Sequence, residues 1–292
     1  MSNQLQVLFI NHTGEMGGAE YCLEALLTRL PVDARVVLFS TGPLVDRLES
    51  HNISVEILSG TNGLLSLGKE TSLSARLWAA HRLPPLVRQL TERARRADVI
   101  YVNSKKSLLF AALAARQTGR LLIWHQHDEM RPPRTLPLRA RLSEGLLIHL
   151  LNRYAARVVS VSRAVADTLI AAGGRADLPV VIHNGLDPAR YAQPVDRARL
   201  RRELGFPVEA PVVGCFGRLT DWKGQSVLIE ALSRLPRAHA ILVGGAIFGE
   251  SGYEAALRAQ VERLGLTQRV HFLGHREDVP ALMQVVDIVV HT

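Results

Sequence analysis

Cysteine, lysine and long apolar runs are scarce in this sequence of 292 residues. Its two cysteines, Cys22 and Cys215, lie far apart in the chain, which excludes a disulfide framework, gives no support to a cysteine-ligated zinc site and favours the reducing cytoplasm. No run of 18 or more apolar residues occurs, so we expect neither a membrane-spanning helix nor an export signal. Hydrophobic residues make up 47% of the chain, which predicts a folded protein of about two domains.

The positive charge comes mostly from arginine. Four of the 35 basic side chains are lysines, the other 31 are arginines, and the formal net charge is +8. A basic chain favours anionic partners such as nucleotides, phosphates, nucleic acid or an acidic membrane surface. The arginine excess agrees with phosphate recognition by the guanidinium group, but a compositional bias of the genome explains it more simply. Charge alone therefore leaves the partner open.

Short apolar segments alternate with longer segments of helical period along the whole chain. This alternation is typical of repeated βα units around a buried parallel sheet. It predicts strands at residues 6–10, 35–39, 55–58, 99–102, 121–124, 158–161, 180–182, 212–216, 240–243, 270–273 and 288–290. It predicts helices at residues 19–30, 73–96, 108–116, 138–154, 164–171, 225–235, 253–264 and 279–285. The expected fold class is α/β, with two doubly wound domains.

The pattern weakens after the seventh predicted strand, which indicates a domain junction. We expect an N-terminal domain at residues 1–188, a polar, arginine-rich connecting segment at 189–209, and a C-terminal domain at 210–292. Only four strands fall in the second domain, where about five or six are usual. We therefore expect this second domain to be incomplete.

Three common nucleotide-binding motifs are missing. The loop after the first predicted strand does not read Gly-x-Gly-x-x-Gly, and the second strand ends at Phe39-Ser40 without an acidic residue, which argues against a nicotinamide dehydrogenase. No Walker A loop occurs, so hydrolysis of nucleoside triphosphates loses its main support. No Asp-x-Asp is present either, so metal-independent chemistry fits better.

Two other loops join a strand to a helix with the features of an anion site. The first, residues 11–20, contains Gly17 and Gly18, and glycine lets the main chain approach a ligand at a helix N-terminus. The second, residues 213–225, contains Arg218 and Lys223, which offer a bidentate guanidinium and a point charge. Taken alone, the first loop is explained equally well as a plain strand-to-helix turn. The cations of the second loop are, taken alone, explained equally well as solvated side chains. Together with the helix start, the two cations predict a site for a diphosphate leaving group.

The fifth predicted strand ends in a polar cluster, Trp124-His125-Gln126-His127-Asp128-Glu129. Ligands of open α/β sheets bind at this edge. The two histidines raise the alternative of a metal site, but we expect their side chains to point to opposite sides of the strand, and no third ligand is evident. We therefore predict no metal site.

Two arginine-rich segments, residues 76–96 and 131–157, also carry leucines at helical spacing. Such a segment can lie on an anionic membrane surface. One stripe follows a four-residue spacing: Leu138, Leu142, Leu146, Leu150 and Tyr154. A helix facing a protein core would show the same stripe, so peripheral contact with the inner membrane surface stays an alternative to an ordinary solvated helix.

Four stretches occur in a familiar order: Gly17-Gly18-Ala19-Glu20, Ile182-His183-Asn184-Gly185-Leu186-Asp187, Gly217-Arg218 with Lys223-Gly224, and Phe272-Leu273-Gly274-His275. In this combination the chain resembles the family 4 glycosyltransferases over essentially its whole length. The resemblance implies a GT-B fold, in which two Rossmann-like domains face each other across a cleft. It also implies metal-independent transfer of a hexose, with retention of configuration, from a nucleotide-diphosphate sugar to a glycan or lipid-linked acceptor in polysaccharide or lipopolysaccharide assembly.

The resemblance assigns donor-binding residues in both domains: Gly17, Gly18, Arg218, Lys223, Gly274, His275 and Arg276. The Arg218 and Lys223 side chains would hold the diphosphate, and the amides of Gly17 and Gly18 would close on the phosphates or sugar from the opposite domain. The last three would border the nucleobase. The catalytic assignment falls on His125, which would orient the sugar rather than act covalently. No cofactor is implied, because the nucleotide sugar is a substrate.

The family pattern normally continues past Thr292 into a Glu-x7-Glu segment that binds donor hydroxyls. We therefore expect this chain by itself to be a fragment with weak or no transferase activity. Two alternatives stay open: a nucleotide-sugar epimerase of the same fold, and a binding module for nucleic acid or an anionic membrane. Basic residues that converge on a cleft would favour binding of a sugar donor, whereas a continuous basic stripe would favour the binding module. We predict the first, and no nucleic-acid partner.

Overall fold

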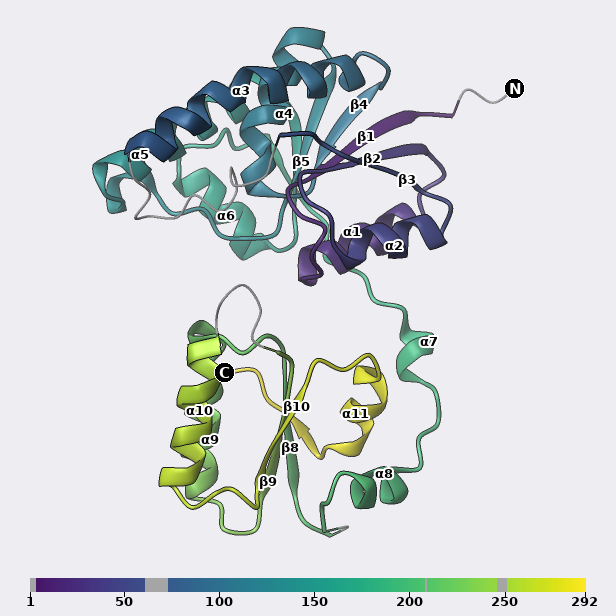
Figure 1. Cartoon of the computed structure of the whole chain (residues 1–292), viewed down its shortest axis with the longest axis vertical. Helices are drawn as coiled ribbons and strands as arrows, with labels where there is room; N and C mark the ends of the chain where they lie inside the picture. Colours follow the sequence, from purple (N-terminus) through teal and green to yellow (C-terminus); the bar gives the residue numbers. More distant parts are fainter. Residues whose placement is uncertain (1–3, 61–72, 208, 246–250) are drawn as a thin grey trace. The chain divides into compact units, whose positions relative to one another are not determined.

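The structure is a computed structural model that describes residues 4–60, 73–207, 209–245 and 251–292. The chain divides into two compact units, Met1–Gly185 and Leu186–Thr292. Each unit is built on one parallel sheet with helices on both faces (Figure 1). The predicted α/β class is therefore confirmed, with a Rossmann-like arrangement in both units.

The sheet of the first unit has seven strands in the order β3-β2-β1-β4-β5-β6-β7. They are β1 (Gln6–Asn11), β2 (Asp33–Leu38), β3 (Ser54–Ile57), β4 (Val99–Val102), β5 (Leu121–Gln126), β6 (Ala155–Ser160) and β7 (Pro179–Val181). All seven predicted strands are present. The winding direction reverses between β1 and β4, and a doubly wound sheet binds its ligands at the carboxyl ends of the strands beside such a switch point.

Alternation along these strands divides the core of the first unit into two layers. The helices are α1 (Gly18–Leu27), α2 (Pro43–Ser50), α3 (Leu73–Ala94), α4 (Lys105–Thr118), α5 (Leu138–Tyr154) and α6 (Arg163–Ala171), with a 3-10 turn at Pro133–Thr135. Val7 and Phe9 pack with α1 and α2, whereas Leu8 and Ile10 pack in the layer that includes α3, α4, α5 and α6. Successive side chains of a strand point to opposite faces, so an uninterrupted apolar run serves both layers.

The structure adds α2, which the sequence pattern does not predict. The helix has only eight residues, begins with Pro43 after Gly42, and buries just Leu44 and Leu48. Proline suits the first turn of a helix because its missing N–H has no intrahelical partner there. Two buried leucines four residues apart form too short a periodic pattern to predict a helix from the sequence alone.

The second unit repeats the start of the same topology with four strands in the order β10-β9-β8-β11. They are β8 (Val212–Phe216), β9 (His239–Val243), β10 (Val270–Gly274) and β11 (Ile288–Val289). The helices are α7 (Pro188–Tyr191), α8 (Arg197–Glu203), α9 (Gln225–Ser233), α10 (Ser251–Arg263) and α11 (Val279–Val285), with a 3-10 turn at Asp221–Lys223. Helices α9 and α10 cover one face of the sheet, and α8 and α11 cover the other (Figure 1).

A buried arginine joins α8 to the sheet of the second unit. Arg201 is 5% exposed, its Nη2 donates to Asp287 Oδ2 at 2.7 Å, and its Nε donates to the main-chain oxygen of Val285 at 3.0 Å. The same Asp287 oxygen accepts from the main-chain nitrogen of Val212 at 2.7 Å. One carboxylate thus ties α8 to the start of β8 and to the segment before β11.

Candidate functional site

Two loops at the carboxyl edge of the first sheet are locked together at Gly14 and Gly42. The main-chain nitrogen of Leu44 donates to the Gly14 oxygen at 2.9 Å. A Cβ atom on Gly14 would lie 2.6 Å from the Gly42 nitrogen, and one on Gly42 would lie 2.4 Å from the Gly14 carbonyl carbon. No side chain fits at either position without displacing main-chain atoms. The β2–α2 loop therefore determines the path of the β1–α1 loop toward Gly17.

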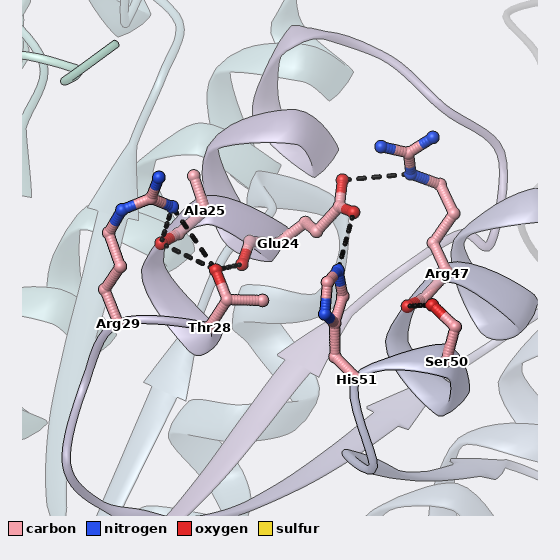
Figure 2. A network of polar contacts seen from close by, with 7 residues as sticks. All are labelled: Glu24, Ala25, Thr28, Arg29, Arg47, Ser50 and His51. Atoms are coloured by element: carbon pink, nitrogen blue, oxygen red, sulfur yellow. Dashed lines mark hydrogen bonds and ion pairs between the residues drawn. The ribbon is translucent and has the colours of Figure 1, made fainter. Parts of the chain in front are cut away.

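A second contact fixes α1 against α2. Glu24 of α1, which is buried, accepts from Arg47 Nε of α2 at 3.0 Å and lies 3.6 Å from His51 Nε2, as Figure 2 shows. The Arg47 guanidinium also lies 5.5 Å from the centre of the Tyr21 ring. A buried carboxylate with two basic partners holds the helices more firmly than an exposed ion pair would, because exposed ion pairs contribute little to stability. The N-terminal turn of α1 is thus carried on a braced pair of helices.

The two glycines predicted to bind the donor have different surroundings. Gly17 is the N-cap of α1, and its main-chain N–H bonds the carboxylate of Glu20. Glu20 is 6% exposed, and burial raises the pKa of its carboxyl group although Asn11 and the helix N-terminus oppose that shift. Gly18 is exposed, with no atom within 4 Å of where a Cβ would lie. The first turn of α1 therefore already contains an acidic group of its own, in the manner of a capping box.

His125 lies in a buried pair with a tyrosine. Its Nδ1 is 2.9 Å from the Tyr101 hydroxyl, the imidazole is 5% exposed, and burial lowers the pKa of His125 to about 3. Burial in turn raises the pKa of Tyr101. Both rings are uncharged near neutral pH, because removing a charged imidazole or phenolate from water is costly.

The structure corrects one expectation about this strand end. His125 and His127 do not point to opposite sides: their ring centroids are 4.0 Å apart. Adjacent residues of a strand alternate, so residues two apart share a face. His127 is half-buried, and its Nε2 is 3.0 Å from Asn103 Oδ1. Among the described residues, no group of three or more histidine, cysteine or acidic side chains is arranged to hold a metal ion.

In the second unit, the two predicted phosphate-binding cations share one aromatic ring. Arg218 follows β8, Lys223 ends the 3-10 turn before α9, and Trp222 lies between them with 62% of its surface exposed. Lys223 Nζ is 4.5 Å and Arg218 Cζ is 5.8 Å from the centre of the Trp222 ring. Gln225 Nε2 donates to the Arg218 main-chain oxygen at 2.7 Å. The indole thus holds two like charges close together, since each is attracted to the ring.

The loops after β8, β9 and β10 are joined by main-chain contacts. Gly217 donates to the Val243 oxygen at 2.8 Å, and Gly244 donates to the Gly274 oxygen at 2.7 Å. A Cβ on Gly244, whose φ is +143°, would lie 2.0 Å from the Gly217 oxygen. The predicted cation loop therefore has a fixed position relative to the loop that begins at Gly274.

The predicted nucleobase border contains a paired arginine. Arg276 donates from Nε and Nη2 to the two carboxylate oxygens of Asp278, at 2.8 and 2.7 Å. This pairing raises the pKa of Arg276 and lowers that of Asp278. His275 is exposed, and Gly274 has a positive φ of +65°. Each unit thus places its own predicted residues at the carboxyl edge of its sheet.

Two family models match the chain: residues 16–190 match Glycosyltransferase Family 4, and residues 196–292 match Glycosyl transferases group 1. The chain belongs to the family 4 glycosyltransferases. The family resemblance that the sequence motifs indicated is therefore confirmed. Among curated proteins, the chain is 28% identical over 180 residues to the lipopolysaccharide core biosynthesis mannosyltransferase LpsB of Rhizobium meliloti, over 58% of this chain and 51% of that protein. It is 37% identical over 118 residues to the D-inositol 3-phosphate glycosyltransferase of Corynebacterium efficiens, over 37% of this chain and 28% of that one.

Solved structures extend this comparison over almost the whole chain. The crystal structure of Anabaena Alr3699/HepE in complex with UDP and glucose is 39% identical, with a TM-score of 0.83, and the match covers 99% of this chain and 74% of that one. The structure of WaaG, a glycosyltransferase involved in lipopolysaccharide biosynthesis, has a TM-score of 0.66 at 15% identity and supports the GT-B fold alone. The chain spans about half, or less, of the length of the curated relatives it matches.

The motif analysis assigned no binding role to four polar residues at the switch point: Asn11, Glu20, Asn103 and His127. Asn11 and Asn103 end or follow the two strands where the winding reverses, and both are almost fully buried. A polar residue directly after an apolar strand was the available signal. This signal indicates that the two asparagines lie close together only once the strand order is known to place β1 beside β4.

Proposed function

We propose that this glycosyltransferase moves a hexose from a nucleotide-diphosphate sugar to a glycan or lipid-linked acceptor, with retention of configuration and without a metal. The observation that carries the proposal is the pair of cations, Arg218 and Lys223, held on Trp222 at the carboxyl end of β8. The complex of the 39% identical Anabaena protein with UDP and glucose supports a nucleotide-sugar donor.

The chemistry that the two cations supply is charge stabilisation. Departure of the sugar leaves a negative charge on the diphosphate while the anomeric carbon becomes cationic. Arg218 and Lys223 need no reorganisation as this charge develops, and a preorganised donor of this kind contributes about 3 to 4 kcal/mol. We infer front-face attack guided by the leaving phosphate, since no carboxylate nucleophile was evident among the motif residues.

Two of the similar proteins suggest different donors. The Anabaena protein was also solved with UDP-glucose, at 39% identity over 98% of this chain. A GDP-mannose-dependent mannosyltransferase of Corynebacterium glutamicum is 27% identical over 68% of this chain. Identity and coverage both favour UDP-glucose, which we propose as the donor.

Thermal unfolding with added donors tests this proposal. Ligand that binds only the folded state raises stability by about 2.7 kcal/mol at 100 times its dissociation constant, so UDP-glucose should raise the melting temperature more than GDP-mannose does. Arg218→Ala and Lys223→Ala should each remove the shift. Arg237→Ala, which removes an exposed cation at the opposite edge of the second sheet, is the matched control and should keep it. Equal shifts in all three variants would exclude the donor site.

We further propose that α5 contacts an anionic membrane surface. Leu138, Leu142 and Leu146 are 70%, 66% and 51% exposed, whereas Leu150 is 6% exposed. A four-residue step turns about 40° around a helix of 3.6 residues per turn, so the predicted stripe starts on the outside and reaches the core only near its end. Among the described residues, no helix is both long and apolar enough to cross a bilayer.

Charge around the exposed leucines matches such a surface. Arg134 and Arg141 are exposed, and Glu144 is the one acidic residue between positions 131 and 154. Its carboxylate accepts from Lys105 Nζ at 2.7 Å. The segment from Arg134 to Leu146 therefore combines exposed leucines with exposed arginines, as interfacial helices do.

Sedimentation with lipid vesicles tests the membrane contact. The protein should bind phosphatidylglycerol vesicles and not phosphatidylcholine vesicles, and Leu142→Glu should weaken binding about tenfold or more, because burial of a leucine contributes about 1.5 to 3 kcal/mol. Val227→Glu, at a position 60% exposed in the second unit, is the control. Unchanged binding of Leu142→Glu, or dimerisation of the protein through α5 in sedimentation equilibrium, would contradict the proposal.

A further inference from the structure

Residues 182–187, one of the stretches that carry the family resemblance, have no part in the proposed function. They connect β7 to α7, all of them are exposed, and none lies in a helix or strand. The main-chain nitrogen of Ile182 donates to the Ser160 oxygen at 3.0 Å, and His183 Nδ1 lies 3.1 Å from the main-chain oxygen of Val161. The chain is therefore held to the first sheet up to His183 and is exposed beyond that residue.

Asn184 and Gly185 come directly after this anchor. Cys22 Sγ, in α1, donates to Asn184 Oδ1 at 3.1 Å, and burial raises the pKa of this thiol, which keeps its proton on the sulfur at neutral pH. A donor on a carbonyl oxygen makes the carbonyl carbon more open to attack, because it stabilises the negative charge that forms on the oxygen. Among the described residues, no acceptor is bonded to Asn184 Nδ2 or to the main-chain N–H of Gly185. The amide of Asn184 is thus held by its oxygen, and the next main-chain nitrogen is unbonded.

An asparagine followed by glycine is a chemically reactive pair. The main-chain nitrogen of the second residue can close a five-membered ring on the side-chain carbonyl carbon of the first. A side chain on the second residue crowds this approach, and glycine has none. A nitrogen whose N–H is bonded in a helix or sheet would lose that bond on turning toward the carbon, but Gly185 has no such bond to lose. Nothing lies within 4 Å of where a Cβ of Gly185 would be, so the fold leaves space around the attacking nitrogen.

We propose that Asn184 is a modification site, at which the side-chain amide is lost spontaneously to give aspartate and isoaspartate. The main-chain nitrogen of Gly185 gives its proton to hydroxide and bonds to Asn184 Cγ, the Cγ–Nδ2 bond breaks, and ammonia leaves. Water then opens the succinimide ring. Cleavage of the bond between the ring nitrogen and Cγ leaves aspartate, and cleavage of the bond between this nitrogen and the main-chain carbonyl carbon leaves isoaspartate. The balance is one water consumed and one ammonia released, with no oxidation or reduction.

Both products change the end of the first unit, because the two compact units meet between Gly185 and Leu186. Aspartate adds a negative charge beside Cys22. Isoaspartate carries the main chain through the former side-chain carbon and so lengthens it by one atom. Residues 182–194 are exposed, so neither product has to fit into a core. We therefore expect the conversion to alter the connection between the units while both cores stay folded.

Peptide mass spectrometry of the folded protein, aged at 37 °C in mildly alkaline buffer, tests the proposal. Trypsin releases residues 176–190, in which Asn184 is the sole asparagine. This peptide should gain the mass difference between an oxygen atom and an NH group, and it should separate into two products. The one labelled by a methyltransferase specific for isoaspartate should be the more abundant. The rate should lie within about threefold of that in a synthetic peptide of residues 176–190, because an exposed segment opens at almost no free-energy cost.

Two controls separate this reaction from general ageing. Gly185→Ala should slow it about tenfold or more, since a methyl group crowds the attacking nitrogen, and should leave the melting temperature unchanged, since the fold has space for that Cβ. Asn152, inside α5, should stay intact in the tryptic peptide of residues 142–153, because its side chain bonds the Arg175 nitrogen and the Gly173 oxygen at 2.8 and 2.9 Å. The other Asn-Gly pair, at residues 62–63, lies outside the described residues and in a different tryptic peptide.

Two results would overturn the proposal. A rate in the folded protein about tenfold or more below that of the free peptide would show that the fold protects Asn184. Equal rates in the parent and in Gly185→Ala would exclude attack by the main-chain nitrogen. No step of this experiment uses a nucleotide sugar, so its outcome is independent of the proposed function.

Discussion

At the scale of single residues, burial controls the charge of the groups at the edge of the first sheet. His12, directly after β1, has its pKa lowered to about 4 by burial and by the nearby positive charge of Lys106. His125 has a pKa of about 3 for the same main reason, with His127 adding a smaller effect. Glu20 is shifted the other way, toward its neutral acid. The edge thus has fewer charges near neutral pH than its residue types suggest.

These histidines make the first unit sensitive to acid. Their folded-state pKa values lie below the ordinary value of 6.5, so the unfolded chain takes up protons first as the pH falls. The stability from keeping these rings neutral is complete above about pH 6.5 and is lost toward pH 4 and below. We expect His125→Gln to reduce the slope of unfolding free energy between pH 6.5 and 5 by up to about 1.4 kcal/mol per pH unit.

Urea unfolding at several pH values measures this slope. His149→Gln, at an exposed position of α5, serves as the matched control and should behave like the parent. If His125→Gln loses stability with acid as steeply as the parent, the ring is not held neutral by its surroundings.

At the scale of elements, the β1–α1 loop depends on a neighbour that is distant in sequence. Gly14 contacts Gly42 through main-chain atoms, and Glu24 with Arg47 joins α1 to α2. The helix start that carries Gly17 and Gly18 is therefore placed by β2 and α2 as well as by β1. The position of a loop with few side chains of its own comes from the elements packed against it.

Alanine at Gly14 should destabilise the first unit by about 1 to 3 kcal/mol, because its Cβ has no space beside the Gly42 main chain. Alanine at Gly18, in the first turn of α1 with nothing within 4 Å, should be neutral or slightly stabilising, since alanine favours helix over glycine. Chemical denaturation followed by circular dichroism compares the two variants. Equal stability of both would show that the loops separate without cost.

At the scale of the whole molecule, the chain consists of two units with separate cores. Each hydrophobic cluster draws its residues from one unit, and residues 182–194 between the two sheets are exposed. A segment with so little burial has a low local stability. We therefore expect the segment around the junction of Gly185 and Leu186 to be the first to unfold locally and to be cut by a protease.

Brief trypsin treatment should cut after Arg190, in the short helix α7, which is exposed. Mass spectrometry should then detect a fragment that begins at Tyr191 and remains resistant, because α8 is held to the second sheet through Arg201 and Asp287. Arg201→Ala should make that fragment short-lived, whereas Arg199→Ala, on the exposed side of α8, should not. Persistence of the fragment in Arg201→Ala would contradict this role of the buried arginine.

The sequence by itself determined the strands, most of the longer helices and the family of this protein. Runs such as Val7-Leu8-Phe9-Ile10 are apolar on both faces, and only a strand covered on both sides buries such a run. Glycines and cations directly after strands likewise mark Gly17, Arg218 and Lys223 without any coordinates, because the chemistry of an anion site is local to a loop. Their roles at the donor site stay predictions.

Tertiary structure alone decided which polar residues meet. Asn11 and Asn103 are 92 positions apart in sequence, and they share a hydrogen bond because the sheet winds in opposite directions from β1 and β4. Only the packed structure likewise shows that Gly14 lies against Gly42 and that the first leucines of α5 are exposed. Periodicity shows that a residue belongs to a face, but only the packing of one element on another determines what that face contacts, since burial and hydrogen bonding depend on neighbours that the local sequence does not contain.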